Sequence, residues 1–131
     1  MTPLFDVETA EELLSRPNAP FKLNDRHRSG GWITFPNGWT VSVQWSGGNY
    51  GSNYDFEIGQ FPAPPAATAE IAIWKGDKAD LQEWEDGDTV QGWLSWEDVQ
   101  RVLDLCEHDR ILTTVTTHKL VASRDEAKVS A

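Results

Sequence analysis

The feature that most constrains the fold of this chain is a pair of short β-like segments around Pro36-Asn37-Gly38. In residues 39–45 the apolar residues Trp, Val, Val and Trp alternate with Thr, Ser and Gln. A period of two is typical of a strand that buries one face. Asn and Gly tolerate positive φ, so Pro-Asn-Gly is suited to a tight turn. Residues 32–35 and 39–45 are therefore predicted to form an antiparallel β-hairpin.

Two helices are predicted. Residues 6–16 carry Thr9-x-x-Glu12, which has the form of a capping box, and Pro17 helps to end the segment. Ser95 is a preferred N-cap, and the acids that follow it complement the helix dipole. Apolar residues then recur at helical spacing and are expected to pack on the sheet: Trp96, Val99, Val102, Leu103 and Cys106.

The remaining segments complete an α+β fold. Residues 17–31 are polar and are predicted to be a connection, and residues 61–68 hold three prolines that favour an extended linker. Further strands are predicted at 54–58, 69–74, 89–94 and 111–117. We expect an antiparallel sheet of about four to six strands with a helix packed on one face and a short N-terminal helix. One domain is expected over 1–117, followed by a flexible tail over 118–131.

The charge is large, negative and uneven. The net charge is −10; residues 76–109 carry eleven acids and two bases, whereas residues 21–75 carry four of each. This balance argues against direct binding to nucleic acid and favours a partner protein with a basic surface. A lone cysteine excludes an internal disulfide, and neither a signal peptide nor a membrane-spanning run is recognised. We expect a cytoplasmic protein with no membrane partner.

No residue pattern points to catalysis or to a cofactor. His27, His108 and His118 are far apart, and Cys106 lies on the apolar side of the second predicted helix, where a thiol is unreactive. The acids Asp55, Glu57 and Glu70 have the placement expected for the solvent side of any antiparallel sheet. The expected protein is not an enzyme and needs no metal.

The segment 46–53 is a candidate ligand-binding loop. Its glycines can present backbone N–H groups to a phosphate or carboxylate, and neighbouring aromatic rings could stack on a base. The alternative is a wide connection whose glycines only solve backbone geometry. The candidate residues for a small nucleotide ligand are Trp45, Gly47, Gly48, Asn49, Tyr50, Gly51, Asn53 and Tyr54.

A second candidate site is the acidic region, which interleaves tryptophans with carboxylates. Aromatic anchors within a charged surface are typical of protein-binding patches. Trp96 is assigned to the core by its helical register. The candidate residues for this acidic face are Asp80, Glu83, Trp84, Glu85, Asp86, Asp88 and Trp93.

Several of these motifs occur together in a known group of proteins. Residues 35–44 (Phe-Pro-Asn-Gly-Trp-Thr-Val-Ser-Val-Gln), Gly48-Asn49-Tyr50, residues 69–74 (Ala-Glu-Ile-Ala-Ile-Trp) and Gly92-Trp93 resemble small uncharacterised proteins encoded by bacteriophages. The resemblance covers about residues 32–104 and implies a viral accessory protein, without activity or site residues. A weaker resemblance, to immunity proteins of bacterial polymorphic toxins, rests on strand order, acidity and a Gly-Asp-x-Val before the helix.

These observations lead to one main functional hypothesis and two alternatives. The main hypothesis is a phage-encoded, non-enzymatic protein that inhibits a host protein, as an anti-defence factor, through its acidic tryptophan-bearing surface. The first alternative is sequestration of a small nucleotide signal by the loop at 46–53. The second is an immunity protein that binds a bacterial toxin.

Overall fold

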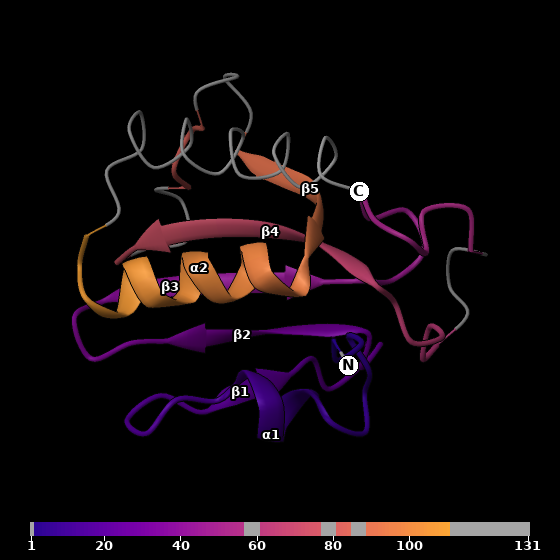
Figure 1. Ribbon diagram of the computed structural model, residues 1–131, viewed down its shortest axis with the longest axis horizontal. Helices are drawn as coiled ribbons and strands as arrows, with labels where there is room; N and C mark the ends of the chain where they lie inside the picture. The colour runs from indigo at the N-terminus through magenta and orange to yellow at the C-terminus, as the bar shows by residue number, and fades with distance from the viewer. Residues whose placement is uncertain (1, 57–60, 77–80, 85–88, 111–131) are drawn as a thin grey trace.

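The computed structural model describes residues 2–56, 61–76, 81–84 and 89–110 (Figure 1). In chain order its elements are α1 (Ala10–Leu14), β1 (Phe21–Leu23), β2 (Gly30–Thr34), β3 (Trp39–Gln44), β4 (Thr68–Lys75), β5 (Val90–Ser95) and α2 (Trp96–Glu107). The strands lie in the order β1-β2-β3-β4-β5, and each neighbouring pair is antiparallel. The predicted α+β class is confirmed. None of the helices in these ranges is long and apolar enough to cross a membrane.

One face of the sheet carries the hydrophobic core. Val41 pairs with Ile73 and Val43 with Ile71, and all four side chains are buried. The helix α2 lies across this face (Figure 1) and buries Val99, Val102, Leu103 and Cys106 against it. The buried residues of α1 belong to the same apolar cluster, so both helices lie on one side of the sheet.

The opposite side of the sheet, which we call the open face, is polar and aromatic. Strand alternation and register place the following residues on it: Lys22, Trp32, Thr34, Thr40, Ser42, Gln44, Glu70, Ala72 and Trp74. Neither α1 nor α2 covers this face.

The predicted hairpin is confirmed, and its turn has a second role. The peptide N–H of Gly38 donates to the carbonyl of Phe35 (2.9 Å), and Gly38 adopts a φ of 97°. The Asn37 side chain accepts from the N–H of Trp39 (3.0 Å) and donates to the carbonyls of Cys106 (2.8 Å) and Glu107 (3.2 Å). Because the last carbonyls of a helix lack partners within it, Asn37 both shapes the turn and satisfies the end of α2.

The second helix starts as predicted, but the first is shorter than predicted. Ser95 caps α2 by accepting from the N–H of Asp98 (3.2 Å). In α1, Thr9 makes no side-chain cap; the carbonyl of Asp6 instead accepts from the N–H of Ala10 (2.9 Å). The helix ends before the extended Ser15, because a residue that precedes a proline, as Arg16 does here, disfavours the helical region. The predicted range 6–16 was therefore too long at both ends.

One connection and one strand were predicted wrongly. Residues 17–31, predicted to be a connection, contain β1 and the start of β2; three residues are too few for a recognisable alternation. Of the strand predicted at 54–58, residues 54–56 are described, and they form turns instead: the N–H of Tyr54 donates to Gly51 (2.9 Å) and that of Phe56 to Asn53 (2.8 Å). The predictions at 69–74 and 89–94 are confirmed by β4 and β5. The strand at 111–117 and the tail at 118–131 lie outside the described residues.

Candidate functional site

The loop at 46–53 is held together by its own hydrogen bonds. The Asn49 side chain accepts from the N–H of Ser46 (3.1 Å), and the N–H of Gly48 donates to the carbonyl of Tyr54 (3.2 Å). Gly48 has a φ of 87°, and a Cβ on Gly51 would lie 3.0 Å from the carbonyl oxygen of Thr68. Gly48 is therefore favoured by the backbone conformation, and a side chain at Gly51 would press on the β4 backbone.

A carboxylate occupies two of the donors that this loop offers. Glu70 on β4 accepts from the backbone N–H of Tyr50 (2.9 Å) and from the side-chain amide of Asn49 (3.4 Å). An anionic ligand at these donors would have to displace Glu70 and would still face its charge. Trp45 and Asn53 are buried, so neither can stack on or bind a base. The loop geometry therefore does not favour a nucleotide.

The fold brings two residues of the loop next to one residue of the predicted acidic face. The rings of Tyr50 and Tyr54 stack with centroids 5.6 Å apart, and Trp93 of β5 lies 6.2 Å from Tyr54. These side chains are 47%, 43% and 54% exposed, respectively. We call Tyr50, Tyr54 and Trp93 the aromatic cluster. It combines parts of two sites that the sequence presents separately.

A β-bulge places Trp93 in this cluster. Ala69 pairs with Leu94 and Ile71 with Gln91, so Gly92 and Trp93 together lie opposite Glu70. Trp93 adopts a φ of 57°, a conformation that costs a bulky residue about 1–3 kcal/mol. Its N–H donates to the carbonyl of Tyr50 (2.7 Å). The backbone therefore holds the Trp93 indole toward solvent, and Trp93 adopts a strained conformation to do so.

Gly92 allows the loop to lie against β5. A Cβ at this position would be 2.2 Å from the Cβ of Tyr50 and 2.8 Å from its carbonyl oxygen. Such contacts are closer than any side chain permits. Gly92 is therefore the point at which the loop and the strand meet beneath the aromatic cluster.

The other predicted acidic-face residues are placed differently. Trp84 is only 3% exposed and belongs to the core, so it cannot be a contact residue. Glu83 is exposed. Trp96 packs on Phe5 with ring centroids 5.3 Å apart, in agreement with its assignment to the core side of α2. Asp80, Glu85, Asp86 and Asp88 lie outside the described residues.

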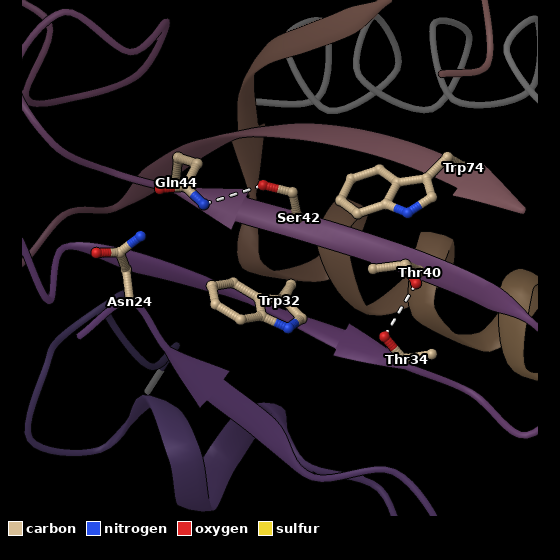
Figure 2. Close-up of a pocket in the computed structure, with 7 residues that line it drawn as sticks. All are labelled: Asn24, Trp32, Thr34, Thr40, Ser42, Gln44 and Trp74. Atoms are coloured by element: carbon tan, nitrogen blue, oxygen red, sulfur yellow. Dashed lines mark hydrogen bonds between the residues drawn. The ribbon is translucent and has the colours of Figure 1, made fainter. Parts of the chain in front are cut away.

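Sequence reasoning missed a groove on the open face. It has a volume of about 340 Å³ and is lined by Asn24, Trp32, Thr34, Thr40, Ser42, Gln44 and Trp74 (Figure 2). Trp32 precedes the buried Ile33 and Trp74 follows the buried Ile73, so alternation assigns both indoles to the face opposite the core. That signal was available in the sequence, because strands were predicted at 32–35 and 69–74, but the order of the strands that brings the two indoles to one groove was not.

The polar side chains of the groove are ordered by contacts with one another and with the backbone. The hydroxyl oxygens of Thr34 and Thr40 are 2.9 Å apart, and the Gln44 amide donates to Ser42 (3.0 Å) and to the carbonyl of Gly31 (3.2 Å). Gln44 lies over Gly30, where a Cβ would come within 2.1 Å of the amide oxygen. The missing side chain at Gly30 therefore makes room for the amide.

Among the residues that the structure describes, the titratable groups were compared with the requirements of metal binding and nucleophilic catalysis. Within the described ranges, no group of three or more His, Cys, Asp or Glu side chains is placed to hold a metal ion. Burial, with a smaller effect of Asp109, raises the pKa of the Cys106 thiol to about 12. This thiol is therefore protonated at neutral pH and is a poor nucleophile.

Two further groups have shifted pKa values for structural reasons. Burial lowers the pKa of His27, whose Nδ1 accepts from the N–H of Ser29 (3.0 Å). Hydrogen bonds from Trp39 and Lys75 lower the pKa of Asp109, and they also tie β3 and β4 to the end of α2.

Comparison of the chain with models of protein families, with curated proteins and with solved structures found no significant match.

Proposed function

We propose that this chain is a phage-encoded, non-enzymatic binding protein that inhibits a host protein, and that the aromatic cluster is the centre of its contact surface. The observation that carries the proposal is the cluster itself: Tyr50, Tyr54 and Trp93 lie side by side, about half exposed. Tyrosine and tryptophan dominate the energetic centres of protein interfaces, because each offers a large rigid area. Strained backbone at Trp93 further supports selection for contact rather than for stability.

The surroundings of the cluster favour a basic partner. Glu70 lies beneath Tyr50, and the exposed Asp55 follows Tyr54 in the chain. The whole chain has a net charge of −10, which would speed encounter with a positively charged surface. Arginine side chains can also stack on the aromatic faces, with cation–π energies of about 0.5–2 kcal/mol each. A partner surface rich in arginine would satisfy both features.

The decisive experiment is site-specific photocrosslinking in cells that produce the protein. A photoreactive phenylalanine analogue replaces Trp93 in one variant and Leu13 in a control; Leu13 is exposed on α1, away from the cluster. We expect position 93 to capture one discrete protein with a basic surface, and position 13 not to capture it. Equal capture from both positions, or none from position 93, would reject the aromatic cluster as a contact surface.

A matched variant separates loss of contact from loss of folding. Glycine adopts positive φ without strain, so Trp93→Gly removes the indole while relieving the backbone. We expect this variant to melt at or above the temperature of the parent protein, to lose binding to the captured protein, and to lose inhibition of its activity. Capture of a toxin rather than a host defence protein would instead support the immunity-protein alternative, with the same contact surface.

A further inference from the structure

We propose that the groove on the open face is a binding site for a short, neutral oligosaccharide. This site is distinct from the aromatic cluster, and its ligand does not depend on the partner proposed above. The argument rests on three properties of the groove: the placement of its two indoles, the chemistry of the side chains between them, and its lack of charge.

The two indoles lie on either side of a polar row. Trp32 on β2 is paired with Ser42 on β3, and Trp74 on β4 is paired with Thr40 on β3. Because neighbouring strands are about 4.8 Å apart, the backbones that carry the indoles are separated by roughly 10 Å. Figure 2 shows the rings of Trp32 and Trp74 on opposite sides of β3, the strand that carries Thr40 and Ser42. A ligand that spans the groove would contact both rings.

Indole faces suit the rings of sugars. An aromatic face is apolar and carries partial negative charge, whereas the C–H groups on one face of a saccharide ring are apolar and weakly positive. Trp32 is 39% exposed, which leaves ring area for such a contact. Stacking alone would also suit a nucleobase, so the polar groups must discriminate between the two.

The polar groups form a set that can both donate and accept. Serine and threonine hydroxyls do either, and each amide offers one acceptor and one donor group. The side-chain amide oxygen of Asn24 accepts hydrogen bonds from the backbone N–H groups of Arg26 (2.9 Å) and His27 (3.2 Å). This fixes the amide with its nitrogen directed toward the groove (Figure 2). Preorganised donors and acceptors match a ligand with several hydroxyl groups and reduce the entropy lost on binding.

The lining carries no charge, although the chain is strongly acidic. Every residue that lines the groove in the described part of the chain is uncharged. Lys22 lies on the same face but lines the neighbouring hollow and not the groove, so a nucleotide phosphate bound between the indoles would lack the cation that usually accompanies it. An acidic sugar would have the same difficulty. A neutral ligand avoids this cost. The uncharged lining of the groove therefore favours a neutral saccharide over a nucleotide.

The size of the groove favours more than one sugar ring. Its volume of about 340 Å³ is at the lower end of the range for small-molecule sites, about 300–1,000 Å³. A second hollow of about 120 Å³, lined by Pro20, Lys22, Trp32 and Thr34, shares Trp32 and Thr34 with it. The binding surface therefore continues past Trp32 toward β1. A short chain of sugar rings would use both hollows.

The test is a titration followed by NMR on the full chain with ¹⁵N-labelled indoles. The probes are four neutral hexasaccharides (maltohexaose, cellohexaose, chitohexaose and laminarihexaose) and, in a second arm, adenosine, guanosine, cytidine and uridine. We expect at least one hexasaccharide to shift the indole signals of Trp32 and Trp74 in a saturable way, and to leave that of Trp93 unchanged. If none of the hexasaccharides shifts the Trp32 and Trp74 signals, or only a nucleoside does, the proposal is wrong.

Variants of the groove complete the test. Trp32→Ala and Trp74→Ala should each lower the affinity for the hexasaccharide at least tenfold. Trp32→Phe, which keeps a smaller ring, should lower this affinity less. Trp93→Gly is the matched control and should bind normally. If an alanine variant does not fold, as judged by its melting curve, Trp32→Phe and Ser42→Ala supply the answer from mild changes. Unchanged affinity in all of these groove variants would overturn the assignment.

Discussion

The aromatic cluster and the open-face groove present the same kind of side chain in opposite settings. In the cluster, Trp93 and two tyrosines stand out from a loop and a bulge, beside the carboxylate of Glu70. In the groove, Trp32 and Trp74 flank a hollow lined by hydroxyl and amide groups. The first setting suits a large, basic surface and the second a small, neutral ligand. Exposure of a tryptophan thus indicates a binding surface, but its neighbours decide the class of ligand.

The strongest way to break this comparison is to remove one indole from each site. Trp93→Gly should weaken binding of the captured protein by about 2 kcal/mol or more, roughly 30-fold in affinity, and leave saccharide binding unchanged. Trp74→Ala should do the reverse. Calorimetry of both variants with both ligands measures this. If either variant impairs both kinds of binding while its melting temperature is unchanged, the two surfaces are one site.

The supporting glycines offer a second contrast. In Gly92→Ala the new Cβ would overlap Tyr50, which should displace the loop and cost about 1–3 kcal/mol of stability. In Gly30→Ala it would overlap the Gln44 amide and approach the carbonyl of Val43 (2.8 Å). We expect the first change to weaken protein binding and the second to weaken saccharide binding. Urea unfolding measures the stability of each variant, and the two binding assays measure its affinity for the protein and for the saccharide. Loss of saccharide binding in Gly92→Ala, or of protein binding in Gly30→Ala, would contradict the assignment.

Salt should separate the two kinds of binding. At the acidic aromatic cluster, raising the salt from ~0.03 to ~0.5 M should reduce the association rate by roughly tenfold or more, because ions screen the attraction to a basic partner. Binding in the uncharged groove should change little. Surface plasmon resonance for the protein and calorimetry for the sugar provide the two measurements. A salt-sensitive sugar affinity would show that charged groups take part in the groove.

The smallest expected effect is a pH dependence confined to the groove. Since burial lowers the pKa of His27 in the folded protein, its contribution to stability is present above the unfolded value of about 6.5 and is lost as the pH falls. Protonation also removes the Nδ1 acceptor of the Ser29 N–H, within the turn that Asn24 organises. We expect saccharide binding to weaken as the pH falls below this unfolded value. In His27→Asn, whose amide oxygen can accept but does not titrate, this dependence should disappear; its persistence would implicate another group.

Much of the fold could be predicted because its signals are local. The hairpin and β4 follow from alternation, and α2 follows from the Ser95 cap and the helical spacing of its apolar residues. The errors arose where local signals were short or ambiguous. The three residues of β1 are too few to show an alternation of apolar and polar side chains. After Gly51 the residues do alternate, but hydrogen bonds within the loop fold them into turns instead of a strand.

The candidate sites were only partly predictable, because their members come from different strands. Tyr50 and Trp93 were proposed for separate sites, and a shift in the register between β4 and β5 brings them together. Trp84 was proposed as a contact residue, yet it is buried in the core. The groove depends on which residues of β2 and β4 lie opposite each other across β3, and composition carries no information on that pairing.

The sequence by itself determined the class of this protein: an acidic α+β domain with one buried and one polar sheet face, since period and charge are properties of the chain alone. Apart from Trp96, which its helical register assigned to the core, only the tertiary structure decided which tryptophans are core, cluster or groove. The reason is physical. Burial of an indole depends on what lies across from it, and that is settled by strand register, by the bulge at Trp93 and by the close approach that Gly92 permits.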